Sequence, residues 1–446
     1  MTTLQDQSVA TSRDHKPFII VSSDSHVGPS PEHLTQYCPA KYRSRWEDWA
    51  KEAEAYRRAQ GKASPIGKMD VKSRWTRNLR TDGHWEPHAR VRDMDFEGIA
   101  AEVVFHGSQN GQHFPFRLPG RDPEETMDQF GSMAPRDPEL AAVGIRMYNR
   151  YVADFVSVAP ERFAALCYVP TWDVEASVAE LEWGAEHGLK GVNFPTVQSY
   201  MPEYNKPVWD RFWAAAQDHG MPLTTHVAIG SDVTDYSGVN GWLIEGVEAI
   251  VLSRRSIIFL VLAGVFERYP NLKLVITEVP GFNWGELATL LDSMWRGWGP
   301  EVLGDTLPEA PSTYMRRSVF VGGSHASRLD VDNAIAAGFG SQFLWGSDYP
   351  HTEGTFQRPE SPADEPNTRL ALRWAFAGRD LDTVEDMLGR TACGVYGFDD
   401  QRLADIASQI SAPTWADVNQ PVDDAEIPEG AGQLYNLAFR RNGPFD

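Results

Sequence analysis

Eight short apolar segments constrain the fold of this chain more than any other feature. In chain order they are 18–21, 101–105, 163–169, 191–194, 222–226, 272–277, 318–321 and 342–345. Short apolar runs of this kind are typical of strands that are buried on both faces of a parallel sheet. Helical patterns lie between several of them, over 139–159, 174–188 and 207–220, and two of these end at the C-cap candidates Gly188 and Gly220. Eight strand-then-helix units predict an α/β fold that closes into a (β/α)8 (TIM) barrel. The alternative, an open doubly wound sheet, is disfavoured because no GxGxxG follows the first segment.

Two long stretches do not belong to an ideal barrel. Residues 37–92 are charged and rich in Trp, and they lie between the first two strands. We interpret them as a helical insertion that caps the mouth of the barrel, where loops normally determine specificity. The sequence therefore predicts a flexible N-terminal tail at 1–16, a barrel at 17–400 and a C-terminal extension at 401–446. That extension is expected to wrap the surface or reach a neighbouring subunit.

Composition excludes several classes of protein. The formal net charge is -21 over 446 residues, which argues against nucleic acid or an anionic membrane as a partner. No apolar run is long enough to span a membrane, and the polar N-terminus lacks the apolar segment of a secretory signal. The three cysteines, Cys38, Cys167 and Cys393, have no CxxC spacing and fit a reducing cytoplasm. The G-x-S-x-G and P-loop motifs are absent as well.

Ionisable residues gather at the ends of four of the predicted strands. Asp24 and His26 follow the first segment, His226 ends the fifth, Glu278 follows the sixth and Asp348 follows the eighth. In a barrel these strand ends converge on one face, so the five side chains are expected to share one cup. Two imidazoles among three carboxylates form a donor set for a first-row metal, and without a cation the carboxylates would repel one another.

Each of these residues also has an ordinary structural interpretation. Asp348 suits the N-cap of a turn, and His226 suits a core histidine bonded to a carbonyl. Glu278 is as consistent with pairing to an arginine as with metal ligation or acid–base chemistry. His325 is a candidate for catalysis against the alternative of a loop histidine, and for His351 a supporting or structural role is favoured over ligation.

Four motifs carry a resemblance to a known family. They are SSDSHVGPS, VRDMDFEGIAAEVVF, FERYPNLKLVITEVPGFNW and FLWGSDYPHTEG. From about Phe18 to Phe398 the chain resembles the amidohydrolase superfamily, in particular its amidohydrolase-2 branch of aminocarboxymuconate-semialdehyde decarboxylase-like enzymes. The resemblance implies a (β/α)8 barrel that binds a divalent metal. The implied ligands are Asp24 and His26 on the first strand, His226 on the fifth and Asp348 on the eighth.

This sequence departs from the pattern of that branch at two places. The first-strand pair is Asp-x-His where many members have His-x-His, which favours iron or manganese over zinc. Near the end of the sixth strand Glu278 stands where many decarboxylases of the branch have a histidine, which disfavours decarboxylation. Glu278 is instead a candidate for a further ligand or for bridging a second metal ion, and His325 for replacing the missing imidazole. We therefore expect one or two ions of iron, manganese or zinc.

These residues support two enzymatic hypotheses and one that is not enzymatic. The first is a hydrolase that uses a metal-activated water to cleave an ester, thioester, amide or activated C–C bond of a small organic molecule, such as a natural product. In that reaction Asp348 holds the metal and takes the proton of water, and Glu278 or His325 protonates the leaving group. The alternative is a metal-dependent, non-oxidative decarboxylase of an aromatic or enoic acid. The third hypothesis is a ligand-binding barrel without catalysis. The resemblance also implies a homo-oligomer, with a dimer expected.

Overall fold

The computed structural model describes residues 13–63, 76–117, 137–227, 238–428 and 437–441. Eight strands form one parallel sheet in the order β1-β2-β3-β4-β5-β6-β7-β8. Their bounds are β1 Val21–Val27, β2 Ala101–His106, β3 Phe163–Tyr168, β4 Gly191–Asn193, β5 Leu223–His226, β6 Leu274–Thr277, β7 Val319–Ser324 and β8 Phe343–Gly346. The prediction of eight parallel strands is therefore confirmed, and the open doubly wound alternative is wrong because the strand order follows the chain order throughout.

The barrel closes between β8 and β1 through contacts at their carboxyl ends. Ser25 and Tyr349 form an isolated parallel bridge. The backbone N–H of His26 donates to Tyr349 O at 2.7 Å, and that of Asp348 donates to Asp24 O at 3.1 Å. Three residues that the sequence predicts as metal ligands, Asp24, His26 and Asp348, thus flank the seam that closes the barrel.

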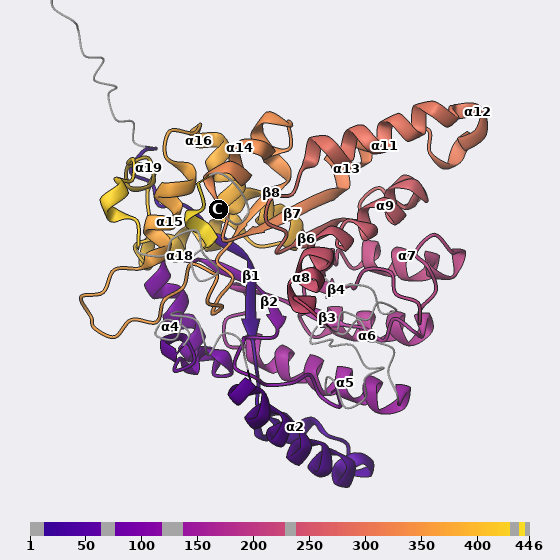
Figure 1. Cartoon of the computed structure of the whole chain (residues 1–446), viewed down its shortest axis with the longest axis horizontal. Helices are drawn as coiled ribbons and strands as arrows, with labels where there is room; N and C mark the ends of the chain where they lie inside the picture. The colour runs from indigo at the N-terminus through magenta and orange to yellow at the C-terminus, as the bar shows by residue number, and fades with distance from the viewer. Residues whose placement is uncertain (1–12, 64–75, 118–136, 228–237, 429–436, 442–446) are drawn as a thin grey trace, which may run out of the picture.

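Helices surround the strands (Figure 1). Their bounds are α1 Pro31–Leu34, α2 Arg43–Ala63, α4 Pro87–Glu97, α5 Pro138–Val156, α6 Val174–Glu186, α7 Asp210–Asp218, α8 Gly241–Leu252, α9 Arg255–Leu262, α10 Val265–Arg268, α11 Trp284–Trp298, α12 Pro300–Leu303, α13 Pro311–Ser318, α14 Arg328–Ala336, α15 Asn367–Phe376, α16 Leu381–Glu385, α17 Thr391–Tyr396, α18 Asp400–Gln409 and α19 Trp415–Val418. The expected terminators are in place, because Gly188 and Gly220 follow α6 and α7 with φ of 84° and 63°.

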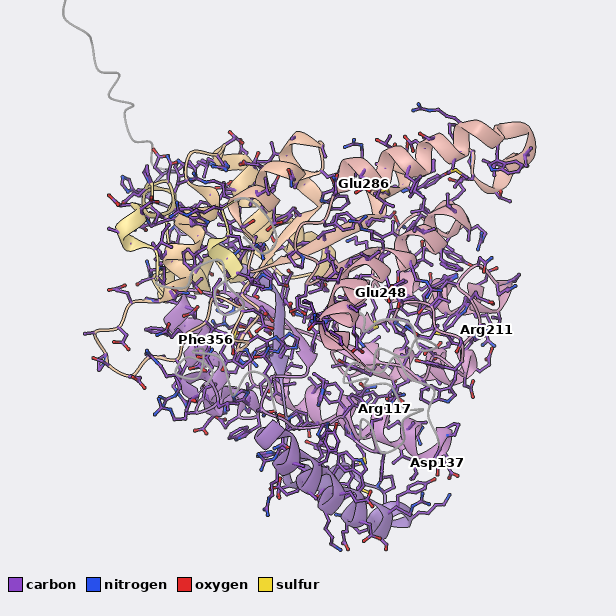
Figure 2. All side chains as sticks on the ribbon, viewed as in Figure 1. Arg117, Asp137, Arg211, Glu248, Glu286 and Phe356 are labelled. Atoms are coloured by element: carbon purple, nitrogen blue, oxygen red, sulfur yellow. The ribbon has the colours of Figure 1, made fainter. Side chains whose placement is uncertain are left out.

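Two hydrophobic clusters lie on the two faces of the sheet. Alternate residues of the strands fill the interior, among them Val21, Val103, Phe105, Ala164, Leu166, Val275, Phe320 and Leu344. The strand side chains that alternate with these point outward and pack against the surrounding helices. Figure 2 shows side chains filling the space between strands and helices. The alternation places the Phe105 ring near His26 and His226, whereas His106 turns outward against Phe114 and against Tyr148 of α5.

The first strand begins and ends later than its apolar segment indicates. The sequence predicts a strand that begins with the apolar run 18–21 and ends at Asp24, but β1 spans Val21–Val27, so His26 also lies within the strand. The register between β1 and β2 shifts between Ser22 and Ser25. Such a bulge re-aims side chains, and bulges are frequent next to active sites.

Part of the insertion between β1 and β2 packs against the carboxyl ends of the strands. Asn78 Nδ2 donates to Pro350 O at 2.9 Å and to Phe356 O at 3.2 Å. The backbone N–H of Gly28 donates to His84 O at 2.8 Å. Residues 64–75 of the predicted 37–92 cap lie outside the described residues, as do residues 1–12 of the predicted tail. Among the helices that are described, none is both long and apolar enough to cross a bilayer.

A buried ion pair from α4 supports β1. The Arg90 side chain is fully buried and its Nη1 donates to Glu102 Oε2 at 2.8 Å. Its Nη2 donates to the carbonyl of His26, and its guanidinium lies 3.8 Å from the centre of the Tyr349 ring. One side chain of the insertion therefore holds β1, β2 and the loop after β8 together.

We expect Arg90→Met to lower the free energy of unfolding by about 3–5 kcal/mol, because it leaves Glu102 buried without its charged partner. Urea unfolding would measure this. Arg92→Met is the matched control, since the Arg92 side chain is 70% exposed and its loss should cost no more than about 0.5 kcal/mol. Adding Glu102→Leu to Arg90→Met should recover most of the loss. Equal stability of the two single variants would contradict the role given to this pair.

Candidate metal centre

The structure brings the five predicted side chains together at the carboxyl end of the barrel. Three overlapping groups of donor atoms each lie within 4.8 Å. They are Asp24, His26 and His226; His26, Asp348 and His351; and Glu278, Asp348, His351 and Glu353. Asp24, His26 and Asp348 are fully buried, and His226 is 5% exposed.

His26 directs Nε2 at two carboxylates, which raise the pKa of the ring against the effect of burial, so without a metal a proton on Nε2 lies between them. Its Nδ1 lies 3.1 Å from the carbonyl of His106, an acceptor, so Nδ1 carries the proton. Its Nε2 then faces Asp24 Oδ1 and Asp348 Oδ1, each at 3.2 Å. None of these three converging atoms has a hydrogen-bond partner among the described residues. Acceptors that face one another in a buried site require a proton or a cation between them, so the donor set fits a metal ion.

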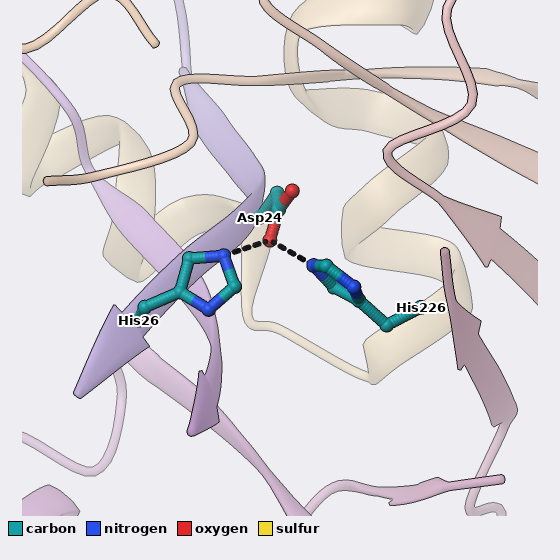
Figure 3. A group of neighbouring side chains, drawn as sticks. All are labelled: Asp24, His26 and His226. Atoms are coloured by element: carbon teal, nitrogen blue, oxygen red, sulfur yellow. Dashed lines mark ion pairs between the residues drawn. The ribbon is translucent and has the colours of Figure 1, made fainter. Parts of the chain in front are cut away.

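His226 completes the first group from the other side of the barrel. Its Nε2 lies 3.7 Å from Asp24 Oδ1 and 3.2 Å from Glu278 Oε2. Figure 3 shows the Asp24 carboxylate between the rings of His26 and His226. Asp24 is itself held, because Ser324 at the end of β7 donates to its Oδ2 at 2.5 Å. Burial lowers the pKa of His226 to about 4, so the ring is neutral at physiological pH, as a metal ligand must be.

His351 and Glu353 extend the cluster toward the loop after β8. His351 Nδ1 lies 2.9 Å from Asp348 Oδ1 and 3.8 Å from Glu353 Oε1. The ring stacks on His26 with centroids 3.9 Å apart, and its Nε2 is 2.7 Å from the carbonyl of Gly107. Gln109 Nε2 holds both oxygens of Glu353 at 2.8 and 2.9 Å. His351 therefore both positions the centre and offers a donor atom to it.

Burial and neighbouring charges shift the pKa of these groups in different directions. Burial, Asp348 and Asp24 raise the pKa of Glu278 well above 4.5. Against the effect of burial, Asp348 and Glu353 raise the pKa of His351 well above 6.5. Also against burial, His351 and His26 hold the pKa of Asp348 below its usual value. In the absence of metal these neighbours therefore favour the ionised form of Asp348 and the protonated form of Glu278.

Three residues of the site adopt a backbone conformation that is rare outside glycine. Glu278, His325 and Asp348 follow β6, β7 and β8 with φ of 58°, 41° and 56°. Positive φ costs about 1–3 kcal/mol at such residues and persists only where the surroundings enforce it. Asp348 is held by its N–H to Asp24 O, and His325 by its N–H to Gly346 O at 2.9 Å. Such outliers cluster at functional sites, which supports a functional role for all three strand ends.

The sequence predicted five of the residues that converge at this candidate centre, but not all of them. It placed Asp24, His26, His226, Glu278 and Asp348 in one cup, and the structure brings them together there. His325 Nε2 lies at the edge, 4.0 Å from Asp348 Oδ2. Glu353 was missed, although Glu353 follows His351 at a spacing of two residues, which could have indicated a pair. Which of these residues bind metal remains a prediction.

Comparisons with known proteins agree with this architecture. A sequence model of the family described as Amidohydrolase matches residues 115–398, well over half of the chain. The chain belongs to the amidohydrolase family. In a curated relative, the 2-keto-4-carboxy-3-hexenedioate hydratase of Sphingobium sp. (strain NBRC 103272 / SYK-6), 174 residues are 27% identical. This alignment covers 36% of this chain and spans half the length of that relative.

Two solved structures share the fold of this amidohydrolase family member. An amidohydrolase from Mycobacterium avium subsp. paratuberculosis superposes with a TM-score of 0.61 at 16% identity, over 86% of this chain and 99% of that one. A dihydroxybenzoic acid decarboxylase from Polaromonas sp. JS666, with bound manganese and the inhibitor 2-nitroresorcinol, gives a TM-score of 0.56 at 17% identity, over 86% and 99%. Beyond the family name amidohydrolase, the activities named for these relatives are decarboxylation and hydration.

The raised pKa of Glu278 predicts a pH-dependent loss of stability in the metal-free protein. Below pH 4.5 the carboxyl is protonated in both the folded and the unfolded chain; above it, only the folded chain keeps the proton. Relative to Glu278→Gln, the wild type should lose about 1.4 kcal/mol of unfolding free energy per pH unit until Glu278 ionises. Urea unfolding between pH 5 and 8 in the presence of a chelator would measure this.

Glu286→Gln is the control for that experiment, because its side chain is 65% exposed at the start of α11 (Figure 2). Its unfolding free energy should follow that of the wild type at every pH. Parallel curves for wild type and Glu278→Gln would contradict the burial of this carboxyl among other acids.

Proposed function

We propose that this protein is a metal-dependent, non-oxidative decarboxylase of an aromatic or enoic carboxylic acid. The observation that carries the proposal is the buried convergence of His26, His226, Asp24 and Asp348, with the Glu278 carboxyl 3.2 Å from His226 and its pKa raised by burial and by the neighbouring acids. The shared fold with a manganese-containing dihydroxybenzoic acid decarboxylase supports the same chemistry. The likeness to that enzyme is one of fold; in this chain the donor set accounts for binding an anionic carboxylic acid and Glu278 for the proton transfer.

Asp24, His26, His226 and Asp348 would hold the ion. Two carboxylates and two imidazoles suit manganese, iron or zinc, and the oxygen share favours the first two. A divalent ion supplies a positive charge and free coordination positions for an anionic substrate. The ring of His26 is oriented by the carbonyl of His106, and Asp24 by Ser324, so both donors are fixed before any ligand arrives.

Glu278 is the proton donor in this scheme. Its carboxyl transfers a proton to the substrate carbon that carries the carboxylate, and a C–H bond forms there. The C–C bond to the carboxylate then breaks, its electron pair returns to the ring or double bond, and carbon dioxide leaves. The Glu278 carboxylate regains a proton from solvent. A raised pKa is what this role requires, because a donor must still hold its proton near neutral pH.

Hydration of an enoic acid is the second candidate. The 27% identity to a hydratase and the contact of Glu278 with His226 favour it. In that reaction Glu278 in its ionised form takes a proton from water, the oxygen adds to one alkene carbon and a proton is added to the other. The two candidates thus use one carboxyl in opposite protonation states.

A substrate panel separates the reactions. Manganese-, iron- and zinc-loaded protein would be incubated with hydroxybenzoates and carboxylated enoic acids, and with esters, thioesters and amides. Release of carbon dioxide from an acid of the first group supports the proposal. Hydration without carbon dioxide supports the second candidate. Cleavage of esters, thioesters or amides alone would overturn both in favour of a hydrolase.

We expect Asp348→Asn to weaken metal binding by at least about tenfold, because the amide removes a charge shared by two of the donor groups. Metal content per chain, measured by mass spectrometry after purification without chelators, tests this. Asp382→Asn is the control, because the Asp382 side chain is 63% exposed and pairs with Arg13. Two metal ions per chain in the wild type would indicate a second metal site at Glu278, His351 and Glu353. No uptake by the wild type would overturn the proposal.

A further inference from the structure

The C-terminal segment Leu437–Arg440 reaches the candidate metal centre from outside the matched amidohydrolase region, residues 115–398. The side chains of all four of its residues are buried, and that of Arg440 is 0% exposed. The segment is fixed at both ends. The backbone N–H of Leu437 donates to Glu353 O at 3.3 Å, and Trp374 Nε1 donates to Arg440 O at 3.4 Å. The segment thus ties the end of the chain to the loop after β8.

The guanidinium of Arg440 lies between Asp330 and His325. Its Nη2 donates to Asp330 Oδ2 at 2.6 Å, and its Nη1 lies 3.5 Å from His325 Nδ1. Asp330 is itself held by Ser327, which donates to Oδ2, and by the N–H of Gly281, which donates to Oδ1 at 2.9 Å. A carboxylate fixed by the loops after β6 and β7 therefore sets the position of the guanidinium.

The position of the Arg440 guanidinium determines which nitrogen of the His325 imidazole carries the proton. A guanidinium carries only donors, so the ring nitrogen that it faces presents a lone pair. The proton of the neutral ring is then on Nε2, which lies 4.0 Å from Asp348 Oδ2. We infer that Arg440 is a positioning residue that fixes the tautomer of His325 with its Nε2–H directed at the metal centre. Under the proposed function, on which this part rests, that N–H donates a hydrogen bond to an oxygen of the anionic substrate.

Protein labelled with 15N in histidine and loaded with zinc tests the tautomer directly. The set of 15N signals that disappears in His325→Gln belongs to His325. The wild type should show a protonated Nε2 and an unprotonated Nδ1, and Arg440→Gln should show a mixture of both tautomers. Arg441→Gln is the matched control, because its side chain is 51% exposed and pairs with Asp424. It should give the wild-type spectrum. A proton on Nδ1 in the wild type, or an unchanged spectrum in Arg440→Gln, would overturn the inference.

Kinetics on the decarboxylation or hydration substrate gives a second readout. Arg440→Gln should lower kcat about 10–100-fold with a smaller change in KM, and added guanidinium should restore part of kcat. Arg441→Gln should stay within about twofold of wild type, since Arg441 is 51% exposed and pairs with Asp424. If Arg440→Gln unfolds, Arg440→Lys keeps the donor and charge and should retain the wild-type tautomer. An inactive wild type would refute the proposed function alone, because the tautomer is measured without substrate.

Discussion

The contact of His26 Nε2 with the carboxylates of Asp24 and Asp348 is the interaction on which most of the structure depends. All three groups are fully buried, which is costly for two carboxylates of like charge unless a cation lies between them. The same two acids lie at the seam where β8 meets β1, joined through the N–H of Asp348 and the carbonyl of Asp24. Closure of the barrel and assembly of the centre therefore occur at one place, so the bound metal would stabilise the fold as well as the reaction.

The backbone contributes to the centre as much as the side chains do. Glu278 and His325 are the first residues after β6 and β7, Asp348 is the second residue after β8, and all three have positive φ. Glycine would adopt this conformation without strain, but it carries no side chain for the cup. The strain is therefore offset by backbone hydrogen bonds to neighbouring strands, such as that of Glu278 N–H to Gly322 O at 3.2 Å. A loop free of such bonds would relax to negative φ and move its side chain.

The sequence predicted what depends on short-range pattern and missed what depends on distant contacts. The eight strands were predictable because buried parallel strands are apolar along their whole length, as Leu344 and Val275 illustrate. The extent of β1 beyond Val21 was not, because Ser22 and Ser23 are polar yet fully buried within the strand. Arg440 gave no signal at all, since it reaches His325 across 115 residues from a tail without periodicity. The metal-ligand set could not predict the reaction either, because the same ligands can activate water or hold a carboxylate.

Charge explains why such a site would need its metal before its substrate. The chain carries a net charge of -21, and Asp24, Glu278, Asp348 and Glu353 converge on one cup. A carboxylate substrate approaching that cup alone would be repelled at short range, where screening by salt is weak. Arg440 is committed to Asp330, so it offsets little of this repulsion. Under the proposed function, a divalent ion would cancel two of these negative charges and present the substrate with a positive centre. The acidic centre would then recruit its anionic substrate through the cation.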